Sequence, residues 1–205
     1  MFTKMGVPNG EMALFTSLLY LPWTLKPLWS PLVDIFRTKR WWIVMMQALV
    51  SAAFVLLALT LPSPETSTQV PMSLFTFTLL LFVFAAFSSA THDIAADGFY
   101  MIALDSGQQS FFVGIRSTFY RLSSIFGQGV LVVVAGVLEE KTGNIPLAWA
   151  LTIGLTAVIF TILTIYHSFA LPRPAGDSAV STDGSGSAGE FAKAFASFFR
   201  KPGVW

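Results

Sequence analysis

Ionisable side chains interrupt two of the five long apolar stretches of this chain. The run THDIAADG places His92, Asp93 and Asp97 inside one stretch, and GIRSTFYRLSS places Arg116 and Arg121 inside the next. A charge at the centre of a bilayer costs at least about 2.5–3.5 kcal/mol on insertion scales. Such residues usually face a protein interior or a water-filled cavity, where they mark pathways. This pattern favours a transporter over other classes of membrane protein.

The overall composition is that of a protein whose main partner is the lipid bilayer. Hydrophobic residues make up 54% of the chain and charged residues only 11%, whereas a soluble domain carries roughly 25% charged residues. The net charge of +1 argues against a nucleic-acid partner, which usually leaves a basic footprint. The absence of cysteine excludes disulfides and thiolate metal sites.

The positions of the apolar segments predict an all-α fold, a polytopic membrane helical bundle. A spanning helix needs about 20 mostly apolar residues, and none of the candidate segments shows the sustained alternation of a strand. Short polar joints between the segments predict antiparallel neighbours. Five transmembrane helices are expected at about 11–33, 41–61, 72–104, 111–138 and 147–171.

The first of these segments carries three prolines, Pro22, Pro27 and Pro31. Proline removes a backbone hydrogen bond and bends or breaks a helix. We therefore expect an irregular first helix, with Lys26 close to its cytoplasmic end.

Basic residues are distributed unequally between the two sides of the predicted bundle. One side has only Lys4 and Lys141. The other side collects Arg37, Lys39, Arg40, Arg173, Lys193, Arg200 and Lys201. By the positive-inside rule the richer side is cytoplasmic. The amino terminus is then outside and the carboxyl terminus inside.

Both ends of the chain suggest a fragment of a longer protein. An outside start without a signal peptide predicts that a preceding helix is missing. Positions 172–189 are rich in Pro, Gly, Ser and Asp and predict a flexible cytoplasmic linker. Positions 190–201 place four phenylalanines on one helical face, which suits an amphipathic helix on the membrane surface or one packed against the rest of the protein. Positions 202–205 read as the truncated start of a further segment.

The third and fourth segments are expected to form an antiparallel hairpin that turns near Gly107. Counting from that turn places Asp97 at the depth of Arg116 and Asp93 at the depth of Arg121. The two aspartates share one helix face, whereas the two arginines are separated by roughly 140° around their helix. We expect one arginine to pair with an aspartate and the other to face a different helix or a cavity.

These side chains, together with Lys26, predict a charged layer in the cytoplasmic half of the bundle. Its members are Lys26, His92, Asp93, Asp97, Arg116 and Arg121. The layer could bind an anionic solute through Arg or Lys, carry protons through Asp or His, or only hold helices together by ion pairs. His92 alone is more typical of a structural residue, and His167 is expected at the interface. Zinc needs three or four ligands, so no metal site and no cofactor is expected.

Three sequence runs resemble a known family. The run KPLWSPLVDIFRTKRWW is similar to the loop between helices two and three of major facilitator superfamily transporters, with Ser30 as the small residue and Asp34 as the aspartate. Its basic cluster consists of Arg37, Lys39 and Arg40. The runs SSATHDIAADGFY and YRLSSIFGQG, taken with LWSPLVD, resemble the AmpG-type muropeptide permeases, a branch that also includes acetyl-CoA transporters.

This resemblance implies a fold and an activity for the full-length protein. The chain would supply helices two to six of twelve, with helix one and the whole second half missing. The full protein would take up anhydro-muropeptides across a bacterial inner membrane, driven by protons. Asp34 and its basic cluster would belong to a cytoplasmic gate, and Asp93, Asp97 and Arg121 to the motifs of helices four and five.

Two other classes compete with the permease. An intramembrane acyltransferase could use His92 and Asp93, but neighbouring positions on a helix point about 100° apart, so the two residues do not readily form one catalytic dyad. Neither an H-E-x-x-H nor a G-x-S-x-G motif occurs in the chain, so no enzyme is expected. A membrane scaffold or receptor without transport activity is the third interpretation.

Overall fold

The computed structural model describes residues 8–61 and 72–179 and four positions beyond them, 189, 192, 195 and 196. Every regular element within these residues is helical, which confirms the predicted all-α class. Most of the predicted amphipathic helix at 190–201, and all of 202–205, lie outside the described residues. Among the described residues, four helices are long and apolar enough to cross a membrane: Lys39–Thr60, Leu74–Ala103, Ser106–Thr142 and Ile145–Ala170.

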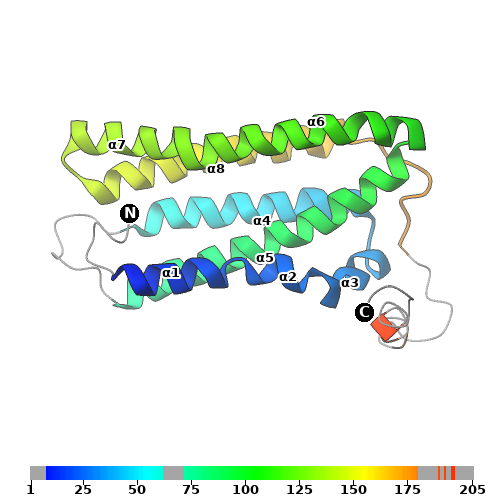
Figure 1. The fold of residues 1–205 in the computed structure, drawn as a ribbon, viewed down its shortest axis with the longest axis horizontal. Coiled ribbons are helices and arrows are strands. Elements are labelled where there is room, and N and C mark those ends of the chain that lie inside the picture. The colour runs from blue at the N-terminus through cyan, green and yellow to red at the C-terminus, as the bar shows by residue number, and fades with distance from the viewer. Residues whose placement is uncertain (1–7, 62–71, 180–188, 190–191, 193–194, 197–205) are drawn as a thin grey trace.

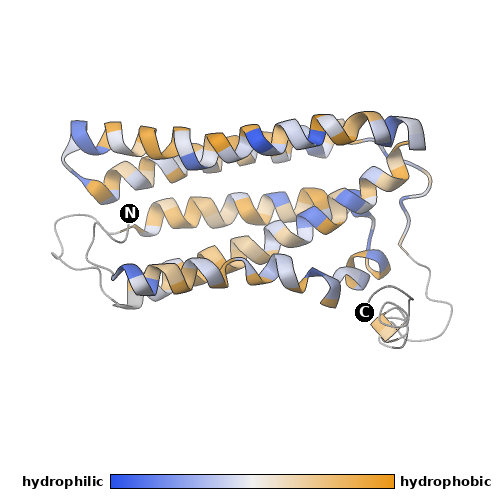
Figure 2. Cartoon of the chain, viewed as in Figure 1, coloured by the Kyte–Doolittle hydropathy of each residue, from blue (hydrophilic) through white to orange (hydrophobic). Residues whose placement is uncertain are grey.

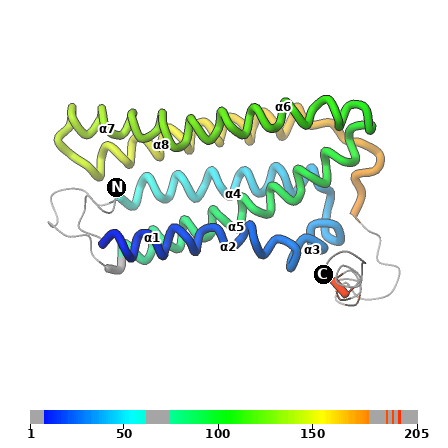
Figure 3. Tube along the Cα trace, in the orientation of Figure 1, coloured from blue at the N-terminus to red at the C-terminus, as the bar shows by residue number. Residues whose placement is uncertain are grey.

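The structure divides the first predicted segment among several short elements. These are α1 (Asn9–Leu18), α2 (Leu21–Leu25), the 3-10 turn η2 (Lys26–Leu28) and α3 (Ser30–Ile35). A proline stands in the first two positions of α2, of η2 and of α3, where its missing N–H is tolerated and its fixed φ favours a new helical start. The three prolines therefore explain why no single helix covers 11–33. Figures 1 and 3 show these elements following one another alongside α5.

The centre of the bundle is α4 (Lys39–Thr60), which packs against α5 (Met72–Ala103) and α8 (Ile145–Ala170) (Figure 1). Leu57 and Ala53 of α4 are fully or almost fully buried, at 0% and 1% exposure. The Ser51 hydroxyl lies 2.6 Å from that of Thr161 and joins α4 to α8. Small residues and hydroxyl contacts of this kind hold helices together in lipid, where hydrophobic burial adds little.

The remaining helices form one long run with a local irregularity. Asp105 caps α6 (Ser106–Ile125) through a capping box with Gln108. A π-helical turn, η3 (Phe126–Val130), then leads into α7 (Leu131–Thr142). Gly143, with φ of 64°, ends α7 and lets the chain turn back into α8. Single π turns inside long helices occur frequently at functional sites.

Polar residues are not confined to the ends of these helices. Figure 2 shows hydrophilic positions within α5 and α6, in the half of the bundle near the α5–α6 turn. No residue of α6 is buried, although the run that contains it is apolar enough to span a membrane. The protein therefore has a membrane helix whose polar face is left uncovered by the described part of the chain.

The tight contact around α4 predicts a sharp difference between two adjacent alanines. Ala53→Leu should destabilise the bundle by about 1–3 kcal/mol, because the larger side chain has no room at a buried position. Ala52 is exposed, so Ala52→Leu is the matched control and should leave stability nearly unchanged. Unfolding in detergent by added SDS measures both; equal effects of the two substitutions would contradict the observed packing of α4.

Candidate functional site

The first ion pair of the predicted charged layer joins the broken first segment to α5. Lys26 Nζ in η2 contacts Asp93 Oδ2, and the side chains are 23% and 43% exposed. The indole N–H of Trp29 donates to Thr91 Oγ1 at 3.2 Å, one turn along the same two elements. The 3-10 turn at Lys26 therefore places a cation against α5, because the prolines break the helix there. The depth count from Gly107 had matched Asp93 with Arg121 instead.

The second ion pair lies across the α5–α6 hairpin. Arg116 contacts Asp97; counting from Gly107 had put Asp97 at a depth similar to that of Arg116 or Ser117. The guanidinium carbon of Arg116 also lies 4.8 Å from the ring centroid of Tyr100, a cation–π geometry. The Tyr100 hydroxyl donates to the carbonyl of Gln109. Asp97, Tyr100 and Arg116 thus tie the ends of α5 and α6 together.

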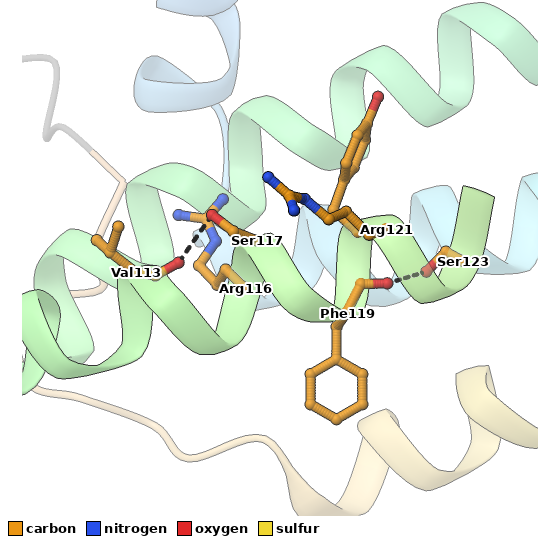
Figure 4. A pocket seen from close by; sticks show the side chains of 7 residues that line it. Val113, Arg116, Ser117, Phe119, Arg121 and Ser123 are labelled. Carbon is orange, nitrogen blue, oxygen red and sulfur yellow. Dashed lines mark hydrogen bonds between the residues drawn. The ribbon is translucent and has the colours of Figure 1, made fainter. Parts of the chain in front are cut away.

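Arg121 differs from the other cations of the layer. Within the described residues it forms no ion pair. Its side chain lines a hollow of about 770 Å³ along α6, together with Arg116, Ser117 and Tyr120. Figure 4 shows Arg121 and Phe119 extending from different sides of α6, and the Ser117 and Ser123 hydroxyls turned back onto backbone carbonyls. The open hollow therefore presents a guanidinium without a protein carboxylate.

The two histidines take no part in these ion pairs. His92 and His167 both line a second cavity, of about 400 Å³, between α4, α5, α6 and α8. His167 Nδ1 is 3.0 Å from Gln47 Oε1, so it contacts α4 within the bundle. In the part of the chain that the structure describes, no three His, Asp or Glu side chains group closely enough to hold a metal ion.

The predicted gate residues form a compact cluster where α3 meets α4. Lys39 Nζ lies 2.8 Å from Asp34 Oδ1. The stem of Lys39 crosses α5 at Gly98, where an added Cβ would lie 2.7 Å from Lys39 Cε. Arg37 adopts a positive φ of 65°, and its guanidinium carbon lies 5.9 Å from the Trp41 ring centroid. Below the cluster, Val33, Ile43, Ala95 and Phe99 form a buried apolar core.

Two further contacts join this cluster to the end of α8 and to the segment after it. Arg40 donates through Nε to the carbonyl of Leu171 at 3.1 Å, and also to the carbonyl of Ser168. The carboxylate of Asp177 accepts from the backbone N–H of Lys39 at 2.6 Å and from that of Arg40 at 3.0 Å. An anion at a helix N-terminus satisfies free N–H groups and the helix dipole. This cluster, here termed the clamp, comprises Asp34, Lys39, Arg40, Gly98 and Asp177.

Sequence reasoning did not identify Asp177 or Gly98 as members of the cluster. Asp177 lies in a segment predicted to be a flexible linker. No residue near it in the sequence indicates that its carboxylate binds the start of a helix more than 130 residues earlier in the chain. Gly98 follows Asp97 in the quoted motif DIAADG, which was the one available signal. A glycine inside an otherwise apolar helix often marks close approach of another group.

The profile of the BT1 family matches residues 1–198. The chain belongs to the BT1 family. Two curated relatives from Rickettsia conorii and Rickettsia felis bear the name "Putative transporter AmpG 4" and are 35% and 33% identical over 156 and 158 residues. No solved structure matches.

Each alignment covers 71% of this BT1 chain and 33% of the relative, so the chain spans about a third of the length of these proteins. The matches confirm the predicted resemblance to the AmpG branch of the major facilitator superfamily. With the four long apolar helices, they make the chain an integral membrane protein.

Removal of the Asp177 carboxylate tests the clamp. Thr38 is the N-cap of α4 and stays in place, but Asp177→Ala removes the acceptor of the N–H groups of Lys39 and Arg40 and should lower the stability of the folded chain by about 1–3 kcal/mol. Asp177→Asn should retain part of that stability, because the amide oxygen still accepts a hydrogen bond. Denaturant titration in detergent measures both variants; an alanine variant as stable as the unsubstituted chain would show that these hydrogen bonds do not stabilise the fold.

Proposed function

We propose that the full-length protein is a secondary active transporter that takes up an organic anion across the bacterial inner membrane, coupled to protons. The chain would provide part of the first half, and a second half of the same polypeptide would close the solute pathway from the other side. Family membership and the AmpG names of the relatives support transport. The clamp residues, which lie on the side rich in arginine and lysine, support a cytoplasmic location for that end.

The single observation that supports an anionic solute is the imbalance of charge in the charged layer. Lys26 is neutralised by Asp93, and Arg116 by Asp97. Arg121 is left with an unpaired positive charge that faces an open hollow. An unpaired arginine in a membrane helix is costly unless water or an anion compensates it, and a guanidinium binds carboxylates and phosphates in a bidentate geometry. Arg121 is therefore the proposed solute ligand.

Anhydro-muropeptide-like cell-wall fragments are the proposed solute class, on the basis of the AmpG resemblance. Such molecules carry peptide carboxylates that a guanidinium can bind. Acetyl-CoA, which carries phosphates, is the alternative within the same branch. Both solutes would need the same unpaired cation, so the charge imbalance fits either one.

The proposed proton carrier is Asp93 in its pair with Lys26. Protonation of the carboxylate would cancel the attraction to Lys26, and deprotonation would restore it. Such a pair can therefore form and break with each transport cycle, as alternating access requires. The structural alternative is a permanent staple between η2 and α5.

The geometry favours transport over an intramembrane enzyme. Asp93 contacts Lys26 of the first segment, whereas His92 lines the cavity bounded by α4 and α8. The two residues therefore do not form an acid–base dyad. A membrane scaffold would not need an unpaired arginine along an exposed helix.

Uptake by the full-length protein in proteoliposomes tests the solute ligand. Arg121→Gln should reduce uptake of an anionic muropeptide by about 10²-fold, because hydrogen bonds to a charged group contribute up to about 3 kcal/mol. Arg121→Lys should retain part of the activity. Ser123→Ala, in the same hollow, is the matched control and should transport normally. Wild-type uptake by Arg121→Gln would sink this assignment.

A second uptake experiment separates proton carriage from stapling. Asp93→Asn alone should abolish the dependence of uptake on a pH gradient, because the amide does not titrate. If the pair were only a staple, the double variant Lys26→Met and Asp93→Asn would recover gradient-driven uptake, since neither charge is then left unpaired. We expect the double variant to remain uncoupled; recovery would refute the proton role of Asp93.

A further inference from the structure

A cavity of about 400 Å³ lies between α4, α5, α6 and α8. Both histidines of the chain line it, His92 from α5 and His167 from α8. Gln47 of α4 borders it as well and lies 3.0 Å from His167 Nδ1. Leu104 and Pro172 are also among its lining residues, so the cavity extends to the ends of α5 and α8 at the clamp side.

One polar atom beside this cavity lacks a partner. His92 Nε2 is buried and forms no hydrogen bond to any described residue. A buried polar atom without a partner costs about 1–3 kcal/mol, and ordered water is the usual remedy where a cavity offers room and several polar partners. Most of the lining of this cavity is apolar, but Gln47, His92 and His167 bring polar groups to it. A water needs about 10–15 Å³ of free space, so a cavity of about 400 Å³ has room for several molecules. His92, Gln47 and His167 would supply their hydrogen-bond partners.

We propose that this cavity holds water and that His92 and His167 exchange a proton through it, at a site separate from the Lys26–Asp93 pair. In each exchange an imidazolium N–H bond breaks, its proton passes to water, and a proton from that water forms an N–H bond on the neutral imidazole of the other ring. Charge and atoms are conserved and no other reactant is needed. The site rests on the cavity alone and does not depend on the proposed solute.

Other titratable and charged groups face these rings from each neighbouring helix. Tyr100 of α5 and Arg116 of α6 line the cavity, and Arg116 is held by Asp97. Tyr166 of α8 lies beside His167, with ring centroids 5.5 Å apart. From α4, Arg40 reaches the end of α8 at Ser168 and is held there by backbone carbonyls. Asp93 is the next residue to His92 in α5 and is held by Lys26. Each of these charged groups has its own partner, which leaves the two imidazoles as the groups free to exchange protons across the cavity.

Thiol labelling tests the water, and the absence of native cysteine makes it simple. Ala96 lines the cavity, whereas its neighbour Ala95 is 0% exposed within the apolar core. A charged methanethiosulfonate should modify Ala96→Cys about tenfold or more faster than Ala95→Cys, since a close-packed core excludes the reagent. Equal rates, or no modification of Ala96→Cys in a folded sample, would overturn the hydrated cavity.

Nitrogen NMR of the imidazoles in lipid bilayers tests the exchange. With only two histidines and a purification tag that lacks histidine, both signals can be assigned by single substitution. Replacement of His167 by glutamine should shift the titration midpoint of His92 by about half a pH unit or more, and His92→Gln should do the same to His167, because interacting sites titrate as a pair. Tyr166→Phe is the matched control and should leave both midpoints in place.

If the titration midpoint of each histidine stays the same when the other histidine is replaced, the proposed proton exchange is wrong. Uptake by the full-length protein is measured separately, so failure of this proposal and failure of the transport proposal are distinguishable.

Discussion

The need to compensate ionised side chains inside apolar helices governs this structure. Lys26 pairs with Asp93 and Arg116 with Asp97, and both pairs form where one helical element meets another. Each pair costs desolvation energy that only a close partner can offset. The pairs therefore join the first segment and α6 to α5, whereas Arg121 forms no ion pair among the described residues.

The broken first segment follows from the same requirement. In a continuous helix, the regular helical repeat alone would determine where the Lys26 side chain lies relative to α5. The prolines instead open a 3-10 turn at Lys26–Leu28, and Trp29 adds a hydrogen bond to Thr91 nearby. The irregular backbone is thus held by protein contacts, which is the condition under which membrane proteins tolerate non-helical backbone. Proline serves here to position a charge, at the cost of regular hydrogen bonding.

The clamp connects the charged layer to the segment beyond α8. Lys39 reaches Asp34 across Gly98 of α5, while Arg40 and the start of α4 hold the end of α8 and Asp177. Movement of any one of these elements must therefore disturb the others. The clamp lies next to the histidine cavity, since its Arg40 donates to the carbonyl of Leu171, which lines that cavity.

The sequence by itself determined the helical class, the membrane location and the family resemblance, because apolar length and short motifs are local properties. Counting from the turn of a short hairpin also predicted that Asp97 lies at a depth similar to that of Arg116 or Ser117, and that one arginine pairs with an aspartate. Counting could not predict which residue pairs with Asp93; the packing of the proline-broken segment against α5 brings Lys26 to it. Only the fold could show that His92 and His167, which are 75 positions apart in the numbering, line one cavity, or that Asp177 accepts hydrogen bonds from the start of α4. These contacts depend on how helices distant in sequence pack together, and such packing leaves no periodic trace in the chain.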